Sequence, residues 1–130
     1  MNIRAYNDGD LDALRSMHAA QGFGYALPDL SDPLLLVRAV VEDEGRLRMA
    51  ALLRLTAEAY LLADPRDGSP RQRWQWLLAL HEATRRAAAA RGLADVQAFL
   101  PPQVARPFGR RLERLGWRRD PWHCYTHRLS

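Results

Sequence analysis

The sequence contains no lysine and a single cysteine, Cys124. A lone cysteine excludes an intrachain disulfide and is typical of a reducing compartment, because disulfides persist mainly in oxidising ones. The apolar runs are far shorter than the roughly 20 residues that a membrane-spanning helix needs, and no basic segment followed by an apolar run opens the chain. We therefore expect a cytoplasmic protein with no membrane partner.

The charge of this chain is unevenly distributed. All 19 basic residues are arginine. Residues 1–65 carry 6 Arg against 10 Asp or Glu, a balance of −4, whereas residues 66–130 carry 13 Arg against 5 acids, a balance of +8. A basic half favours an anionic partner such as a phosphorylated cofactor or nucleic acid. Solvated helix faces and the codon bias of a GC-rich genome are the plainer explanations.

Periodicity in the first half predicts a strand, a helix and three further strands. Apolar residues recur at helical spacing over residues 11–20, where His18 is interpreted as a partly buried structural residue. A loop or short helix rich in glycine and proline follows. Acid-glycine turns between apolar runs indicate antiparallel hairpins. The expected strands are Ile3–Tyr6, Leu36–Val41, Arg46–Leu55 and Ala57–Ala63.

The second half opens with a helix start, Ser69 followed by Pro70, which is a capping hydroxyl before a proline at the first helical position. A broad apolar stripe predicts a helix over residues 70–91, with Gly92 as its cap. The other expected elements are a strand over Leu93–Leu100, an amphipathic helix from Val104 to Leu115, and a final strand over 122–129. A length of 130 residues fits one domain.

This order of elements, β-α-loop-β-β-β-α-β-α-β, resembles the GCN5-related N-acetyltransferase (GNAT) superfamily, and three local features strengthen the likeness. Residues 3–6 with 10–14 resemble the usual opening of that superfamily. Leu61-Leu62-Ala63-Asp64-Pro65 resembles the end of its fourth strand, and Leu115-Gly116-Trp117 resembles the "L-G-F" after its fourth helix. The resemblance implies an α/β (α+β) fold with a mixed, mostly antiparallel central sheet flanked by helices.

The resemblance also implies a site for acyl-CoA. In that superfamily the fourth and fifth strands splay apart, the pantetheine arm pairs with the free backbone, and a glycine-rich loop at a helix start holds the pyrophosphate. Here the glycines of that loop are missing. Anchoring on Pro65 places the loop on Gly68, Ser69, Arg71 and Arg73. We expect Leu61, Leu62 and Ala63 to line the splay and the two arginines to replace the glycines by charge pairing.

Candidate catalytic residues depart from the family pattern as well. Many relatives carry a general-acid tyrosine at the position of Leu112, and leucine cannot donate a proton. Glu58 is the best candidate for the base that deprotonates an amine, with Tyr60 and Asp64 nearby. Tyr125 is the candidate replacement acid. An edge or surface carboxylate with no catalytic role remains the plainer interpretation of Glu58.

Three further patterns have plain explanations. His123, Tyr125 and His127 would share one face of a strand, but no third clear metal ligand accompanies the histidines, so no metal site is expected. Cys124 is interpreted as a packed thiol. Trp74 and Trp76 beside Arg71 and Arg73 could stack on bases, but tryptophans in an apolar stripe are more typical of a core, and nucleic acid is a weak candidate partner.

The resemblance thus predicts transfer of an acyl group, with acetyl favoured, from acetyl-CoA or another acyl-CoA to the amine of a small molecule or peptide. The alternative is a catalytically silent GNAT-like module for binding or assembly, which the missing glycines and tyrosine favour. Small relatives often pair through exposed strands, so a homodimer is left open.

Overall fold

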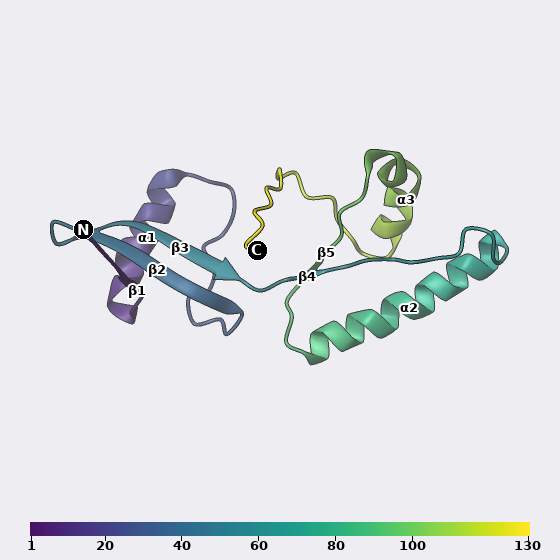
Figure 1. The fold of residues 1–130 in the computed structure, drawn as a ribbon, viewed down its shortest axis with the longest axis horizontal. Helices are drawn as coiled ribbons and strands as arrows, with labels where there is room; N and C mark the ends of the chain where they lie inside the picture. Colours follow the sequence, from purple (N-terminus) through teal and green to yellow (C-terminus); the bar gives the residue numbers. More distant parts are fainter. The chain divides into compact units, whose positions relative to one another are not determined.

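The computed structural model describes residues 1–130 and divides the chain into two compact units (Figure 1). Unit 1 comprises Met1–Ala57 with Ala89–Val96, and unit 2 comprises Glu58–Ala88 with Gln97–Ser130. The elements mix helices with strands, which confirms the α+β class. In chain order they are β1 (Asn2–Ala5), the 3-10 helix η1 (Asp8–Asp10), α1 (Leu11–Gln21), β2 (Leu35–Asp43), β3 (Arg46–Arg54), β4 (Ala57–Glu58), α2 (Pro70–Ala90), β5 (Val96–Gln97) and α3 (Pro102–Arg114).

Unit 1 contains a three-stranded antiparallel sheet in the order β1-β2-β3. The β2–β3 turn has two residues, Glu44 and Gly45, between the paired Asp43 and Arg46. Both turn residues have positive φ, 52° and 73°, as the two-residue hairpin turns with a right-handed twist require. The predicted antiparallel hairpin is therefore confirmed, and Gly45, which adopts a positive φ at no steric cost, favours the turn at this position.

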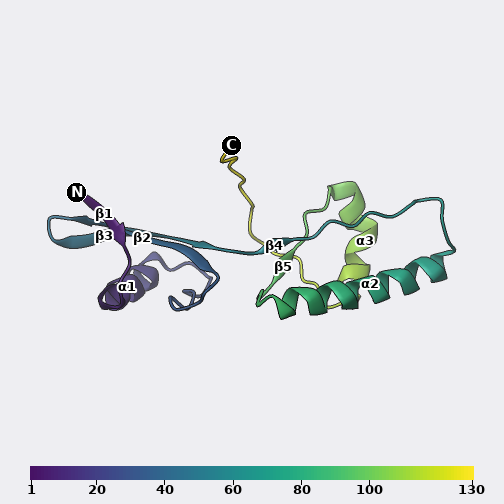
Figure 2. The same cartoon turned by 60° about the horizontal axis from the view of Figure 1, so that its bottom comes forward.

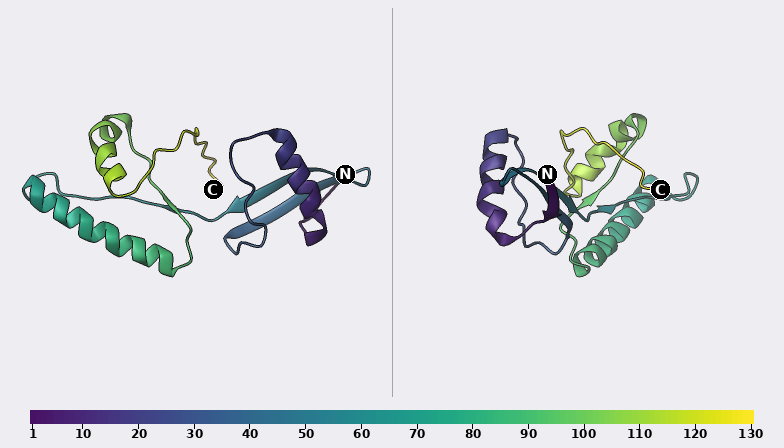
Figure 3. Two further views of the ribbon diagram at one scale, coloured as in Figure 1. Left: turned by 180° about the vertical axis from the view of Figure 1, so that it is seen from behind. Right: turned by 60° about the vertical axis from the view of Figure 1, so that its left-hand side comes forward.

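The core of unit 1 lies between this sheet and α1, which covers one face of the sheet (Figures 2 and 3). Leu14 of α1 is 4% exposed and packs with Leu30 and Leu35. Leu30 comes from the loop that precedes β2, so this loop completes the core. His18, on the same helix, is half-buried and its Nε2 lies 2.7 Å from the Tyr25 carbonyl oxygen. The predicted structural role of His18 is confirmed.

One buried carboxylate ties β1 to the start of α1. Asp10 is 6% exposed and accepts hydrogen bonds from two nitrogens of the Arg4 guanidinium, at 2.8 and 2.9 Å, and from the Asn7 N–H at 2.9 Å. Arg4 also donates to Glu42 on β2 at 3.2 Å. The hydrogen bonds from Arg4 and then from Asn7 lower the pKa of Asp10 to about 2. The opening segment is thus held by ionised groups at neutral pH.

Unit 2 is built on two helices. The predicted bounds of α2 and α3 are confirmed to within a few residues, and α2 is the longer. Neither helix contains a buried residue. A small parallel sheet pairs β4 with β5. Its last backbone hydrogen bond runs from the Ala59 N–H to the Gln97 carbonyl oxygen, at 2.7 Å. No helix combines the length and apolarity needed to cross a bilayer.

Three strand predictions need correction. The strand expected over Ala57–Ala63 is confined to Ala57–Glu58, and the strand expected over Leu93–Leu100 is confined to Val96–Gln97. Residues 122–129, predicted as a final strand, form no regular element. A strand needs a partner for its backbone donors and acceptors, and alternation of side chains does not supply one.

Candidate functional site

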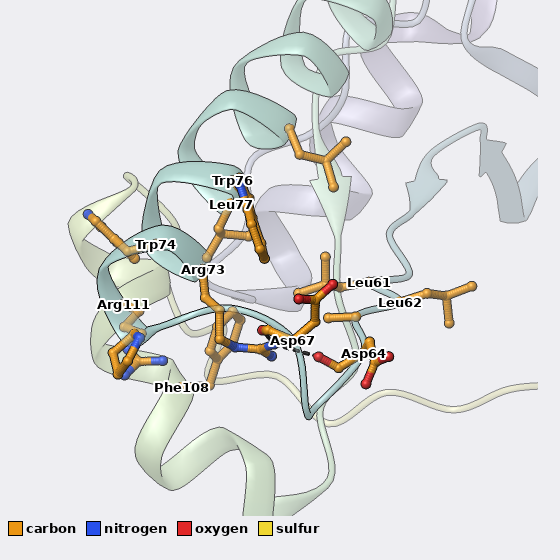
Figure 4. A pocket seen from close by; sticks show the side chains of 13 residues that line it. Leu61, Leu62, Asp64, Asp67, Arg73, Trp74, Trp76, Leu77, Phe108 and Arg111 are labelled. Atoms are coloured by element: carbon orange, nitrogen blue, oxygen red, sulfur yellow. Dashed lines mark hydrogen bonds between the residues drawn. The ribbon is translucent and has the colours of Figure 1, made fainter.

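A cavity of about 440 Å³ lies in unit 2, between the segment that follows β4 and the first half of α2 (Figure 4). Its walls are mainly apolar, with two arginines and two aspartates among them. It is lined by Leu61, Leu62, Ala63, Asp64, Asp67, Pro70, Arg73, Trp74, Trp76, Leu77, Leu80, Phe108 and Arg111. The structure therefore brings together four of the residues predicted from the sequence, namely Leu61, Leu62, Ala63 and Arg73.

The segment Leu61–Ala63 offers an unpaired backbone to this cavity. The last backbone hydrogen bond of the β4–β5 pair is the one from Ala59 to Gln97. Residues 61–63 belong to no strand, and their N–H and C=O groups make no hydrogen bond within the protein. Backbone groups are strong donors and acceptors. This segment can therefore bind the amides of an extended ligand, as a neighbouring strand would.

Gly68 has a structural role in the loop that leads to α2. Its φ is +80°, in the region that favours glycine. A Cβ at this position would lie 2.6 Å from two ring atoms of Trp76. The indole thus packs directly against the glycine, which fixes the loop on the first turns of α2 and forms part of the cavity wall. Gly68 serves this contact and is not itself among the residues that line the cavity.

The start of α2 is capped as the sequence predicts. The Gln72 N–H donates to Ser69 Oγ at 3.2 Å, and the Ser69 N–H donates to Gln72 Oε1 at 2.9 Å. This reciprocal pair is a capping box, and Pro70 occupies the first helical position. Ser69 therefore stabilises the helix start. Arg71 lies in the same turn but does not line the cavity.

Arg73 fastens the loop from within the cavity. Its Nη1 donates to the carbonyl oxygens of Asp64 and Asp67, at 2.5 and 2.8 Å (Figure 4). The Asp67 N–H also donates to the Asp64 carbonyl oxygen, at 3.4 Å, so the guanidinium reinforces a turn that the loop itself forms. The expected direct pairing of Arg73 with phosphate therefore competes with two existing hydrogen bonds.

The end of α3 explains the Leu115-Gly116-Trp117 sequence. Gly116 has a φ of +94°; its N–H donates to the Glu113 carbonyl at 3.0 Å, and the Trp117 N–H donates to the Leu112 carbonyl at 3.0 Å. These two bonds are those of a Schellman motif, which ends a helix with glycine. The turn brings the Trp117 side chain to α2, where its Nε1–H donates a hydrogen bond to His81 Nε2 at 3.0 Å. The motif thus fastens the end of α3 to α2.

Glu58, the candidate base, is exposed at the end of β4. A hydrogen bond to the Glu58 carboxylate raises the pKa of the Tyr60 phenol. The phenol therefore keeps its proton at neutral pH. Glu58 and Tyr60 directly precede the cavity-lining segment, but neither is among the lining residues.

The C-terminal segment lies apart from the cavity lining. Tyr125, the candidate acid, is 94% exposed and does not line the cavity. His127 hydrogen-bonds through Nδ1 with the Arg128 carbonyl, and Cys124 is exposed, so the interpretation of Cys124 as a packed thiol is wrong. No group of three or more His, Cys, Asp or Glu residues is arranged to hold a metal ion.

Several lining residues were not singled out as site residues from the sequence. Trp74, Trp76, Leu77 and Leu80 were interpreted as core, because an apolar stripe on a helix usually packs against other elements. Phe108 and Arg111 lie three residues apart on α3, on one helix face. That spacing is visible in the sequence, but only the fold shows that this face borders the cavity.

Comparison with family models, with curated proteins and with solved structures found no match for this chain.

Proposed function

We propose that this protein is a divergent GNAT-like N-acyltransferase that moves an acyl group, with acetyl favoured, from coenzyme A to the amine of a small molecule or peptide. The observation that carries the proposal is the unpaired backbone of Leu61–Ala63 beside an apolar cavity of about 440 Å³. A pantetheine arm has two amides and short hydrocarbon links. Such an arm fits a surface that combines free backbone groups with leucine and aromatic side chains.

In the proposed reaction the amine nitrogen attacks the thioester carbonyl, and the carbon–sulfur bond breaks. The nitrogen loses a proton, which Glu58 accepts directly or through a water, and the departing thiolate takes up a proton. Tyr60 and Tyr125 are both exposed phenols. Tyr60 is the better placed of the two for the second proton, because it directly precedes the lining residue Leu61.

Acetyl-CoA calorimetry tests this assignment, with a variant that fills the cavity. Ala63 lines the cavity and lies in no regular element, so Ala63→Trp blocks the space with little effect on folding. Ala79→Trp, on an exposed part of α2 outside the cavity, is the matched control. We expect micromolar binding by the unmodified protein and by Ala79→Trp, and a loss of at least about tenfold in Ala63→Trp, equivalent to about 1.4 kcal/mol.

The alternative function is a catalytically silent binding or assembly module. The capped start of α2 and the leucine at position 112 favour it, since both remove parts of the expected machinery. Release of thiol from acetyl-CoA in the presence of an amine panel separates the two functions. Binding without turnover in any condition supports the silent module, whereas no binding at millimolar acetyl-CoA removes the acyl-CoA proposal altogether. Turnover that falls in Glu58→Gln while acetyl-CoA affinity is kept supports the transferase.

A further inference from the structure

The start of α2 has few donors left for an anion. Helix starts bind anions through N–H groups that have no partner within the helix. Here the N–H groups of Ser69 and Gln72 are paired in the capping box, and the Arg73 N–H donates to the Ser69 carbonyl at 2.9 Å. Pro70 has no N–H. Only the Arg71 N–H remains, so this turn alone is a poor anchor for a phosphate.

The guanidinium of Arg73 is also engaged. It holds the carbonyl oxygens of Asp64 and Asp67 and so closes the loop before α2. Moving Arg73 toward a ligand would leave the Asp67 carbonyl without its donor, and the Asp64 carbonyl with only the 3.4 Å hydrogen bond from the Asp67 N–H. The Asp67 carboxylate adds a negative charge on this side of the cavity, whereas the Asp64 carboxylate is paired with Arg66 at 3.7 Å. An anionic ligand group next to the loop would have to compete with these contacts for Arg73.

Arg111 reaches the cavity from α3 and differs from Arg73 in its contacts. Its guanidinium makes no ion pair and no hydrogen bond within the protein, and it lies beside the lining residue Phe108. In Figure 4, Arg111 lies on the opposite side of Arg73 from Asp64 and Asp67. The cavity thus has one end where an arginine keeps its donors free and another where the arginine is engaged by the loop.

We propose that Arg111 is the anion anchor of this cavity and that it binds a phosphate group of the ligand. Its planar guanidinium presents paired donors that match two phosphate oxygens. The inference rests on the proposed function, because it assigns to α3 the phosphate contact that a helix start makes in the GNAT superfamily. The acyl-bearing arm then runs along Leu61–Ala63, away from Arg111.

Inorganic pyrophosphate tests the anchor without any thioester. Its binding is followed by tryptophan fluorescence, since Trp74 and Trp76 line the cavity, and by calorimetry at about 50 mM salt, where exposed charges are weakly screened. We expect Arg111→Gln to weaken pyrophosphate binding at least about tenfold. Arg110→Gln, which removes the same charge from the neighbouring exposed position outside the cavity, should change it less than about twofold. Equal losses in the two variants, or no binding by the unmodified protein, would overturn the anchor.

Acetyl-CoA and acetyl-pantetheine, which lacks phosphate, separate this inference from the proposed function. We expect Arg111→Gln to weaken acetyl-CoA binding and to leave acetyl-pantetheine binding unchanged. Equal acetyl-CoA affinity in Arg111→Gln and the unmodified protein would overturn the anchor while the transferase proposal stands. Pyrophosphate binding that depends on Arg111 but is not displaced by acetyl-CoA would support the anchor and remove the transferase proposal.

Discussion

Unit 1 and unit 2 use similar amounts of chain in different ways. In unit 1, α1 and the loop before β2 cover a three-stranded sheet, and all four buried apolar side chains, Leu14, Leu30, Leu35 and Val40, belong to it. Unit 2 contains all but the last two residues of α2, a helix of 21 residues with no buried residue, together with a network of caps and loop contacts around a cavity. Packing therefore stabilises the first unit, whereas polar contacts and glycine geometry shape the second.

This difference suggests a division of roles. A close-packed core tolerates few changes in volume and has little space for a ligand. A cavity lined by leucines, tryptophans and two arginines has the composition that is typical of binding sites, where apolar walls accompany a few polar groups. We expect substitutions in unit 1 to change stability and substitutions around the cavity to change binding.

The largest expected difference is in the response to a lost leucine. Leu14→Ala removes a side chain that is 4% exposed and should lower the free energy of unfolding by about 3 kcal/mol. Leu78→Ala, on α2, removes one that is 40% exposed and should lower it by less than about 1 kcal/mol. Urea denaturation measures both. Similar losses would show that unit 2 has a buried core of comparable strength, and the contrast between the units would be wrong.

The next effect concerns glycine. Gly68→Ala places a Cβ against Trp76 at a φ of +80° and should cost about 2 kcal/mol. Gly92→Ala, at a φ of +78° with no atom within 4 Å of the added carbon, should cost only the backbone penalty of about 1 kcal/mol. Denaturation followed by tryptophan emission reports on both the stability and the indole environment. Equal costs would mean that Trp76 does not pack against the loop.

A smaller effect separates the cap of α2 from an ordinary helical serine. Ser69→Ala removes the hydroxyl that accepts from the Gln72 N–H and should cost about 1 kcal/mol. Ser16→Ala, at an exposed position inside α1, should change stability by less than about 0.5 kcal/mol. Circular dichroism and urea unfolding provide the measurement. If the two variants were equally stable, the capping box would contribute nothing.

The smallest difference appears only in acid. The folded-state pKa of Asp10 is about 2, below the ordinary aspartate value. Its stabilising effect is therefore complete above about pH 4 and is lost as the pH falls toward 2. Asp10→Asn should remove part of this acid sensitivity between pH 5 and pH 2.5, measured as the urea midpoint. Glu82→Gln should change it little, because Glu82 lies on an exposed helix face where solvent screens the charge, although its pKa is also about 2. If the urea midpoint of Asp10→Asn fell with decreasing pH as steeply as that of the unmodified protein, the Arg4–Asp10 pair would not be the source of the acid sensitivity.

Local signals predicted much of this structure. The Glu44-Gly45 turn, the Ser69-Pro70 helix start and the Gly92 cap were predicted correctly, because each depends on neighbours a few residues away. The segments around β4 and β5 were predicted too long, and residues 122–129 were predicted as a strand that does not form. In each case the side-chain pattern was suitable but no neighbouring strand pairs with the backbone there.

The candidate site divides in the same way. Leu61, Leu62, Ala63 and Arg73 could be proposed from the sequence because they lie close together before and within one helix. Phe108 and Arg111 could not, since they come from α3, more than thirty residues further along the chain. The role of Arg73 is likewise decided by the fold, because its two acceptors are main-chain oxygens that no residue type reveals.

By itself the sequence determined the helices, the hairpin and the caps, because these follow from short-range backbone and side-chain preferences. Only the tertiary structure decided which strands are paired, which backbone is left free along Leu61–Ala63, and which arginine keeps its donors for a ligand. The physical reason is that hydrogen bonds and burial are shared between segments distant in sequence. A group's availability depends on which partner the fold brings to it.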